Sequence, residues 1–147
     1  MVDFPDVNVW VALSSEDHVH HARADQYWRD EAGSRLAFCR VTALGLIRVI
    51  GRGHSVGVPA LSPVDAWATY RRWRSQPETD LLPDPPGIED LIERWTVAGL
   101  ASPKNWTDLY LAAFSTAARL RLVTFDHDFA AFPGIDLLHL DATNDPS

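Results

Sequence analysis

Residues 105–129 read NWTDLYLAAFSTAARLRLVTFDHDF and hold the clearest helix and the clearest strand of the chain. The apolar residues of 105–120 recur at helical spacing, whereas 122–125 is a short apolar run that contains β-branched residues. Asp126 follows this strand directly, and Asp128 comes two residues later. A helix that leads into a buried strand is typical of an α/β fold with a mostly parallel sheet.

The rest of the chain alternates in the same way between short apolar runs and helical periodicity. With 147 residues, of which 46% are hydrophobic, a single domain over residues 1–147 is expected. Glycines and prolines at 51–54 and 83–87 indicate breaks between elements. The expected strands are 2–5, 36–39, 122–125 and 137–140, and the expected helices are 7–13, 17–32, 41–50, one that starts at Ser62, 88–98 and 105–120.

Several classes of protein are excluded by composition. Cys39 is the one cysteine, so an intramolecular disulfide and a cysteine-based zinc site are ruled out. The apolar runs are far shorter than the roughly 20 residues that span a bilayer. The first residues are acidic where a secretory signal is basic. These features predict a cytoplasmic protein without a membrane segment.

Charge is distributed unevenly along the chain. Thirteen basic and twenty acidic residues give a net charge of −7, which disfavours nucleic-acid binding if net charge alone decides. Residues 32–64, however, contain no Asp or Glu but several arginines, whose planar side chains suit phosphate. Two interpretations stay open, a basic surface for a nucleic acid or a general use of Arg in place of Lys. The arginines concerned are Arg35, Arg40, Arg48 and Arg52.

Three acidic residues stand where an expected strand meets an expected helix. Asp6 follows the first strand, Asp108 lies in the first turn of its helix, and Asp126 ends a strand. In open parallel sheets, ligands bind outside the carboxyl ends of the strands, where these acids could converge. Like charges gathered in one cleft raise each other's pKa, and a divalent cation such as Mg²⁺ or Mn²⁺ compensates them. The pattern therefore points to metal-assisted hydrolysis of a phosphate ester.

Each acid also has a purely structural interpretation as a helix cap. Asp6 can cap the first helix, and Asp108 stands three residues after Asn105, as the last member of a capping box does. Asp126 and Asp128 can cap a short turn. Capping explains any one of these acids better than a ligand role does, but coincidence explains the whole set less well.

Four segments, taken in their order along the chain, carry a family resemblance: PDVNVWVAL at 5–13, CRVTALGLIR at 39–48, TDLYLAA at 107–113 and LVTFDHDF at 122–129. Together they resemble PIN-domain ribonucleases, and most of all the VapC toxins of VapBC toxin–antitoxin pairs. The resemblance extends from about residue 6 to 140. It implies an α/β fold with a central parallel sheet in the order 3-2-1-4-5 and helices on both faces.

The resemblance also implies an activity and a set of partners. PIN-domain toxins cleave RNA endonucleolytically with Mg²⁺ or Mn²⁺, and the target would be a tRNA, an rRNA or an mRNA. A VapB-type antitoxin protein would neutralise the enzyme, and a homodimer is expected. No part of this implied function involves a membrane.

Motif by motif, the resemblance assigns roles to the acids of this chain. Asp6 and Asp108 would be the main metal ligands, and Asp126 would be the further catalytic acid of the site. Supporting residues would position these acids by hydrogen bonds or lie beside them. By motif match they are Asn8, Thr124 and Asp128.

One position departs from the family pattern. Many PIN domains carry a Glu in the helix after the second strand, three residues before an Arg, and counting back from Arg48 places Gly45 there. Because residues 32–64 hold no acid, a neighbour cannot replace it, and a single Mg²⁺ is predicted in place of a pair. The departure also keeps an alternative open, a degenerate PIN module that binds RNA or antitoxin without cleaving.

Histidines near the acids support weaker interpretations. His18, His20 and His21 lack the i, i+4 spacing that places two imidazoles on one helix face, so an exposed helix start is expected there. His127 lies between two acids and could donate a proton, although the acids explain the motif without it.

Aromatic residues recur in the helix that starts at Ser62. Trp67, Tyr70 and Trp73 are three residues apart and share a helix face. This spacing favours a place in the core or in a protomer interface over a surface for stacking bases. By resemblance, the antitoxin would place its tail in a groove near this region.

Overall fold

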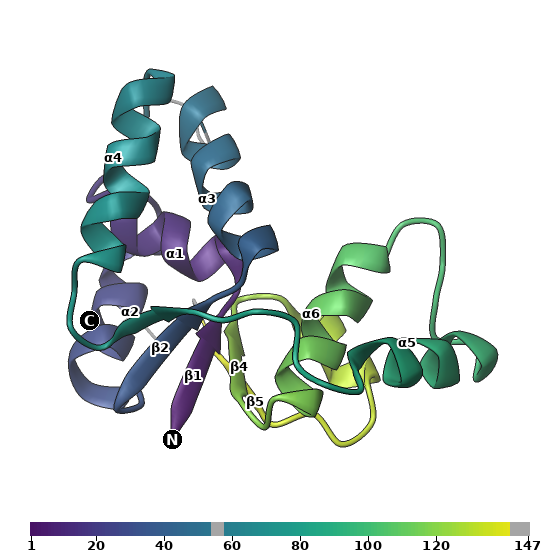
Figure 1. The fold of residues 1–147 in the computed structure, drawn as a ribbon. Helices are drawn as coiled ribbons and strands as arrows, with labels where there is room; N and C mark the ends of the chain where they lie inside the picture. Colours follow the sequence, from purple (N-terminus) through teal and green to yellow (C-terminus); the bar gives the residue numbers. More distant parts are fainter. Residues whose placement is uncertain (54–57, 142–147) are drawn as a thin grey trace.

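The computed structural model describes residues 1–53 and 58–141. At its centre is a five-stranded parallel sheet in the order β3-β2-β1-β4-β5, which confirms the expected order (Figure 1). The middle strand, β1, is therefore hydrogen-bonded on both sides. The strands are β1 (Val2–Pro5), β2 (Arg35–Phe38), β3 (Thr79–Leu81), β4 (Arg121–Thr124) and β5 (Leu137–His139).

Helices cover both faces of the sheet, as expected (Figure 1). Four of them, α1 to α4, pack on one face, and α5 and α6 pack on the other. In the part of the chain that is described, no helix is long and apolar enough to cross a membrane. The helical elements are α1 (Val7–Ser14), α2 (His21–Gln26), the π-helical turn η1 (Tyr27–Glu31), α3 (Arg40–Arg52), α4 (Pro63–Arg74), α5 (Ile88–Val97), α6 (Trp106–Ala117) and the 3₁₀ turn η2 (His127–Ala131).

The two layers are filled by strand residues that point to opposite faces. Phe4 of β1 stacks on Phe114 of α6, with ring centroids 4.8 Å apart. Phe38 of β2 stacks on Trp10 of α1 on the other face, with ring centroids 4.0 Å apart. A parallel sheet needs both faces covered, and these buried rings hold the two helical layers on it.

Three expected helices differ from the observed ones at their ends, and one of them, α6, ends at Ala117 instead of at 120. The second helix begins at His21 instead of near residue 17, because residues 15–20 form turns closed by bonds such as that from the His18 amide to the Ser15 carbonyl. Helix α3 continues to Arg52, so the expected break begins only at Gly53, whose φ is 77°. His54, the last residue of that expected break, lies outside the described residues.

One strand, β3, was not expected from the sequence. Its three residues, Thr79, Asp80 and Leu81, are too few and too polar to give a strand pattern. Asp80 instead faces Arg35 of the neighbouring β2, and the two form an ion pair of 2.7 Å. The edge strand is thus held by a cross-strand pair that periodicity does not reveal.

Candidate active site

The three predicted acids lie at the carboxyl edge of the sheet. Asp6 follows β1 directly, and Asp126 comes two residues after the end of the neighbouring β4. Asp108 reaches the same edge from the first turn of α6. The charges of Asp108 and Asp126 both raise the pKa of Asp6, so the three carboxylates lie within electrostatic reach of one another. All three thus belong to the same edge of the sheet.

Thr124, the last residue of β4, connects the residues around Asp6. Its hydroxyl donates to Asp6 Oδ2 at 2.9 Å, while the Val7 amide donates to Asp6 Oδ1 at 2.7 Å. Thr124 Oγ1 also accepts from the Asn8 side chain at 3.3 Å and from the Asp126 amide at 3.0 Å. Both carboxylate oxygens of Asp6 are therefore held in place, and Asn8 acts on Asp6 through Thr124.

The environment of Asp6 favours its neutral form. Burial is the main cause, and the charges of Asp108 and Asp126 add to it. Together they outweigh the hydrogen bonds from Thr124 and Val7 and raise the pKa of Asp6 to about 6. The pKa of Asp108 is raised as well, by burial and by the charges of Asp126 and Asp128.

This acidic group lacks a cation of its own. Within residues 1–53 and 58–141, none of these carboxylates forms an ion pair with a Lys, Arg or His side chain. In the same residues, no three His, Cys, Asp or Glu side chains are placed so that together they could hold a metal ion. Mg²⁺ keeps most of its water and takes one or two carboxylates, so this donor set suits it. The carboxylates concerned are Asp6, Asp108, Asp126 and Asp128.

The capping interpretations hold for some of these acids and fail for one. Asp6 accepts from the first amide of α1, and Asp126 accepts from the Asp128 amide at 2.9 Å and so caps η2. The expected capping box of Asn105 and Asp108 is wrong, because the Asn105 side chain bonds to the Ser102 amide and the Leu100 carbonyl instead. Asp108 is therefore left without a capping role.

Two cavities open beside the acids, one on each side. Asp108, Asp128 and His127 line a cavity of about 400 Å³. Asp6, Asn8 and His18 line a separate one of about 320 Å³. Asp108 and Asp128 thus border one hollow, and Asp6 borders another.

The histidines of the first loop do not gather into a metal site. His18 and His20 are half-buried and joined by a bond from the His20 amide to His18 Nδ1, whereas the His21 ring bonds to the Ala12 carbonyl. The expected exposed helix start is therefore corrected to a half-buried one, in which imidazoles satisfy backbone groups.

Gly45 is held in place by a close contact between helices. A Cβ atom at this position would lie 2.5 Å from Cγ2 of Val7, the first residue of α1. Val7 is β-branched and has little rotamer freedom in a helix, so it cannot easily move away. The position where the resemblance implies a Glu is therefore one where the packing beside Asp6 requires a glycine.

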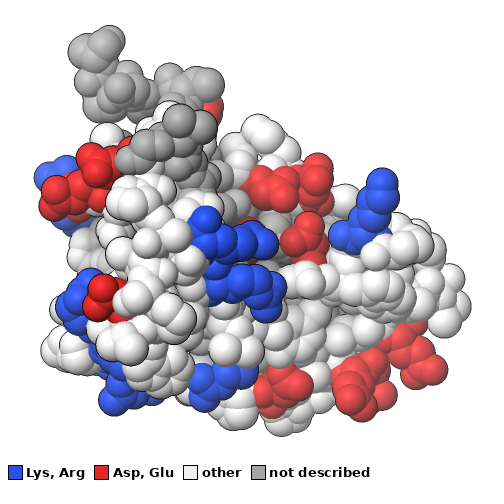
Figure 2. All heavy atoms as spheres, turned by 90° about the horizontal axis from the view of Figure 1, so that it is seen from above, with Lys and Arg blue, Asp and Glu red and all other residues white. Residues whose placement is uncertain are grey.

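The arginines of residues 32–64 do not form one surface. Arg35 stands at the amino end of β2, paired with Asp80, whereas Arg40 begins α3 at the carboxyl end of that strand. Arg48 and Arg52 are exposed on later turns of α3. Figure 2 looks onto the edge toward which β1 points and shows basic side chains gathered directly beside a group of acidic ones.

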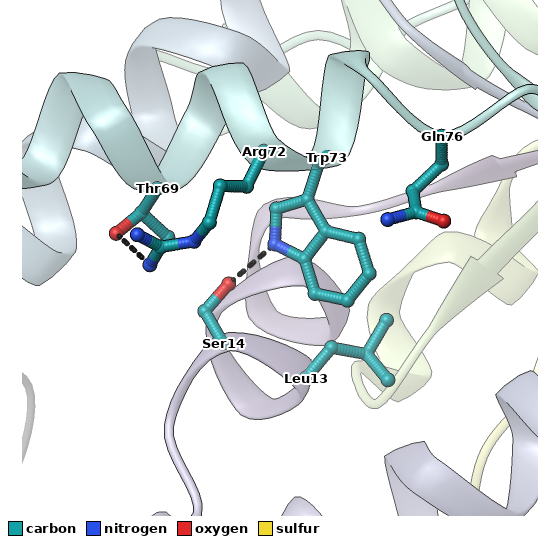
Figure 3. Close-up of a pocket in the computed structure, with 6 residues that line it drawn as sticks. All are labelled: Leu13, Ser14, Thr69, Arg72, Trp73 and Gln76. Carbon is teal, nitrogen blue, oxygen red and sulfur yellow. Dashed lines mark hydrogen bonds between the residues drawn. The ribbon is translucent and has the colours of Figure 1, made fainter.

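The aromatic residues of α4 are mainly part of the core. Tyr70 is buried, and Trp73 packs on Trp10 with its indole N–H donating to Ser14 Oγ at 2.8 Å. Trp67 is 48% exposed. Trp73 and Ser14 also line a pocket between the end of α1 and α4 (Figure 3), whose other lining residues are Leu13, Thr69, Arg72 and Gln76.

One residue near the site was not foreseen. His139, at the end of β5, stacks on His127 with ring centroids 3.9 Å apart. Its sequence neighbourhood is an ordinary short apolar strand, so no signal in the sequence distinguishes it.

Comparisons with known proteins agree with this geometry. A PIN-domain family profile matches residues 4–135. Ribonuclease VapC41 of Mycobacterium tuberculosis is 36% identical over 138 residues, covering 90% of this chain and 94% of that protein. Ribonuclease VapC44 of the same organism is 34% identical over 142 residues, covering 92% and 94%.

Solved structures show the same fold at low sequence identity. VapC20 of Mycobacterium tuberculosis, a sarcin-ricin loop cleaving toxin, superimposes with a TM-score of 0.69 at 14% identity, covering 92% of this chain and 98% of that one. VapBC-1 of nontypeable Haemophilus influenzae gives 0.69 at 15% identity, covering 95% and 98%. The chain belongs to the PIN-domain family and, within it, to the VapC ribonucleases.

Proposed function

We propose that this protein is a metal-dependent endoribonuclease that acts as the toxin of a toxin–antitoxin pair in the cytoplasm. The observation that carries the proposal is the state of Asp6, whose carboxylate is held by two neutral donors and surrounded by further acids. No cationic side chain in the described residues balances that charge. A group of this kind costs stability and is explained by a function that needs it.

Asp6 and Asp108 are the proposed ligands of one Mg²⁺, with Mn²⁺ as a possible substitute, and Asp126 is the further acid. A cation bound there would lower the pKa of a water and stabilise the charge that develops on the phosphate. Thr124 fixes the direction of the Asp6 carboxylate by its hydrogen bond, and Asn8 holds Thr124. A single cation suits the site because Gly45 contributes no carboxylate.

A VapB-type antitoxin is the proposed inhibitor, and a homodimer is the proposed assembly. Similar folds occur in VapBC complexes, including a DNA-bound one from Salmonella typhimurium with a TM-score of 0.67. The pocket between α1 and α4 is the proposed place for an antitoxin segment (Figure 3). Trp67, which is half-exposed on α4, would add apolar contact surface on the same helix. The RNA substrate is expected to be a tRNA, an rRNA or an mRNA.

The test is cleavage of total RNA by purified, antitoxin-free protein with Mg²⁺ or Mn²⁺, beside Asp6→Asn and Asp108→Asn. Both substitutions should reduce cleavage by more than about 100-fold, because even outer partners of metal ligands are worth roughly 10- to 100-fold. Thr124→Val should fall within that lower range. Asp65→Asn is the matched control, since Asp65 is the third residue of α4 just as Asp108 is the third residue of α6.

Binding of Mg²⁺, measured by calorimetry, separates the enzyme from the alternative of a degenerate module. Wild type and Asp65→Asn should bind Mg²⁺, and Asp6→Asn and Asp108→Asn should not. Cleavage that survives in Asp6→Asn would mean a contaminating nuclease and would overturn the site. RNA binding by well-folded protein, without any Mg²⁺ binding or cleavage, would favour the degenerate module.

A further inference from the structure

Two imidazole rings stack beside the acidic site. His127, in η2, lies on His139 with ring centroids 3.9 Å apart and an interplanar angle of 28°. His139 is itself fixed, because its Nε2 lies 3.0 Å from the Phe125 carbonyl oxygen at the end of β4. His127 is nevertheless exposed to solvent. The stack therefore presents one flat ring outward on an anchored support.

The cavity next to this ring has two kinds of wall. His127 lines it together with Asp108 and Asp128, and its volume of about 400 Å³ lies within the range of about 300–1,000 Å³ that small-molecule sites occupy. Apolar groups form the remainder of its lining, apart from Asn105. They are Leu100, Ala131 and Phe132.

This combination suits a nucleobase better than a phosphate. Unpaired bases of RNA stack on His and other flat side chains and use their polar edges for hydrogen bonds. The carboxylate of Asp128, which is not a proposed metal ligand, repels a phosphate but accepts hydrogen bonds from the amino groups of bases. The apolar part of the lining offers contact surface to the face or edge of a base.

We propose that His127, supported by His139, is a stacking platform for one unpaired nucleobase of the RNA substrate, adjacent to the phosphate that is cleaved. The proposal rests on the proposed function, because it takes Asp108 as part of the catalytic site. His127 then contributes by its flat surface and positions the RNA strand relative to the carboxylates. In this proposal His127 is a positioning residue that acts by stacking; its role as a proton donor, considered from the sequence, stays a prediction.

Trp67 provides a matched comparison elsewhere on the surface. It is also an exposed ring that rests on a second ring, Tyr70, with centroids 5.3 Å apart. It belongs to α4 and lines neither of the cavities beside the acids. A general affinity of RNA for exposed aromatic rings would involve both sites, whereas a platform at the active site involves His127 alone.

The first experiment measures RNA binding without cleavage. In an Asp6→Asn background, fluorescence anisotropy follows fluorescein-labelled single-stranded 10-mers of adenylate and of uridylate. His127→Ala should weaken binding roughly fivefold or more, as expected for the loss of one base–aromatic stack. His127→Phe should bind like the parent, because it keeps a flat ring, and Trp67→Ala should have no effect. Thermal melting should show all variants folded, since His127 is exposed.

A second experiment locates the base. One abasic nucleotide is moved through the 10-mer, and binding is measured for the parent and for His127→Ala. At one position the abasic substitution should weaken binding to the parent but have no effect on His127→Ala, because both changes remove the same stack. A loss that is equal in both proteins at every position would overturn the platform, as would His127→Phe binding as weakly as His127→Ala.

The failure of this inference can be told apart from failure of the proposed function. Metal-dependent cleavage that requires Asp6 and Asp108, without position-dependent binding through His127, would overturn the platform and leave the nuclease standing. Position-dependent binding without any such cleavage would overturn the nuclease and keep the platform. A parent protein that binds none of the 10-mers would overturn the platform.

Discussion

Two carboxylates three residues apart, Asp3 in β1 and Asp6 directly after it, lie in opposite environments. Asp3, near the amino edge of the sheet, is fully buried and accepts two hydrogen bonds of 2.9 Å from the guanidinium of Arg121. The Tyr27 hydroxyl adds a bond of 2.6 Å and the Gly33 amide one of 2.9 Å. Asp6, at the carboxyl edge, accepts from one amide and one hydroxyl among the described residues.

The difference separates a structural carboxylate from a functional one. A buried charge is tolerated when it is paired and hydrogen-bonded, and Asp3 meets both conditions through Arg121 and Tyr27. Burial and the nearby charge of Asp3 raise the pKa of the Tyr27 phenol, so it stays a neutral donor. Asp6 meets only the hydrogen-bonding condition, and the negative charges of neighbouring acids disfavour its ionised form further. The charge of Asp3 is thus balanced within the fold, whereas the charge of Asp6 is what the proposed metal ion would balance.

The largest expected effect comes from removing the charge of Asp3. Asp3→Asn should lower the free energy of unfolding by about 3–5 kcal/mol, because it leaves the Arg121 guanidinium without its anion in a largely buried place. Urea denaturation of the metal-free protein measures this change. Asp6→Asn, directly after the same strand, is the control and should cost much less. An Asp3→Asn loss below about 1 kcal/mol would contradict the structural role of this pair.

A smaller expected effect is a pH dependence of stability that comes from Asp6 and not from Asp3. The pKa of Asp6 is raised from 3.8 in the unfolded chain to about 6 in the folded one, so between these values the folded protein holds a proton that the unfolded chain releases. The free energy of unfolding should therefore fall as pH rises through this window, by up to about 1.4 kcal/mol per unit. Below about pH 4 both states are protonated and the effect is absent.

Urea denaturation in EDTA at pH 4.5 and pH 7.5 tests this dependence. Asp6→Asn lacks the titrating group, so its stability relative to wild type should increase by about 2 kcal/mol between the two pH values. Asp65→Asn should run parallel to wild type. Adding Mg²⁺ at pH 7.5 should restore stability to wild type but not to Asp6→Asn. If the stability of wild type and of Asp6→Asn changed with pH in parallel, the pKa of Asp6 would not be raised in the folded protein.

The acids at the carboxyl edge of the sheet could be predicted because each stands at the end of an element whose pattern is local in the sequence. Strand 122–125 was visible as a short apolar run, whereas the opening run to Pro5 was a poor strand pattern because it contains Asp3 and Pro5. The rule that parallel strands end at one edge still placed Asp6 and Asp126 together. The strand order came from the resemblance to a family and not from periodicity. Asp108 was placed by its position in the first turn of a helix, although its expected partnership with Asn105 does not form.

What escaped prediction depends on contacts between distant parts of the chain. The ion pair of Asp3 and Arg121 joins residues 118 positions apart, and Asp3 alone only made the first strand look weak. The stack of His127 on His139 and the contact of Gly45 with Val7 are likewise tertiary. Sequence patterns describe which face a residue occupies, but they do not describe what it meets there.

The smallest expected effect compares two glycines, one at each end. A Cβ at Gly33 would lie 2.6 Å from the Met1 carbonyl oxygen and 3.1 Å from Asp3 Oδ1, while one at Gly45 would lie 2.5 Å from Val7 Cγ2. Each Gly→Ala change should lower the free energy of unfolding by about 1–2 kcal/mol, since overpacking exceeds the gain in conformational entropy. Gly51→Ala is the control on α3, because nothing lies within 4 Å of its Cβ.

Gly33→Ala and Gly45→Ala should differ in their effect on Mg²⁺ binding. Gly33→Ala disturbs the end that binds no ligand, so Mg²⁺ affinity measured by calorimetry should stay unchanged. Gly45→Ala presses on Val7, whose amide holds Asp6, and should weaken Mg²⁺ binding. Gly45→Glu should weaken it further instead of adding a second cation, because its stem meets the same Val7 methyl. A second equivalent of bound Mg²⁺ in Gly45→Glu would show that Val7 can move aside and that packing does not require glycine at this position.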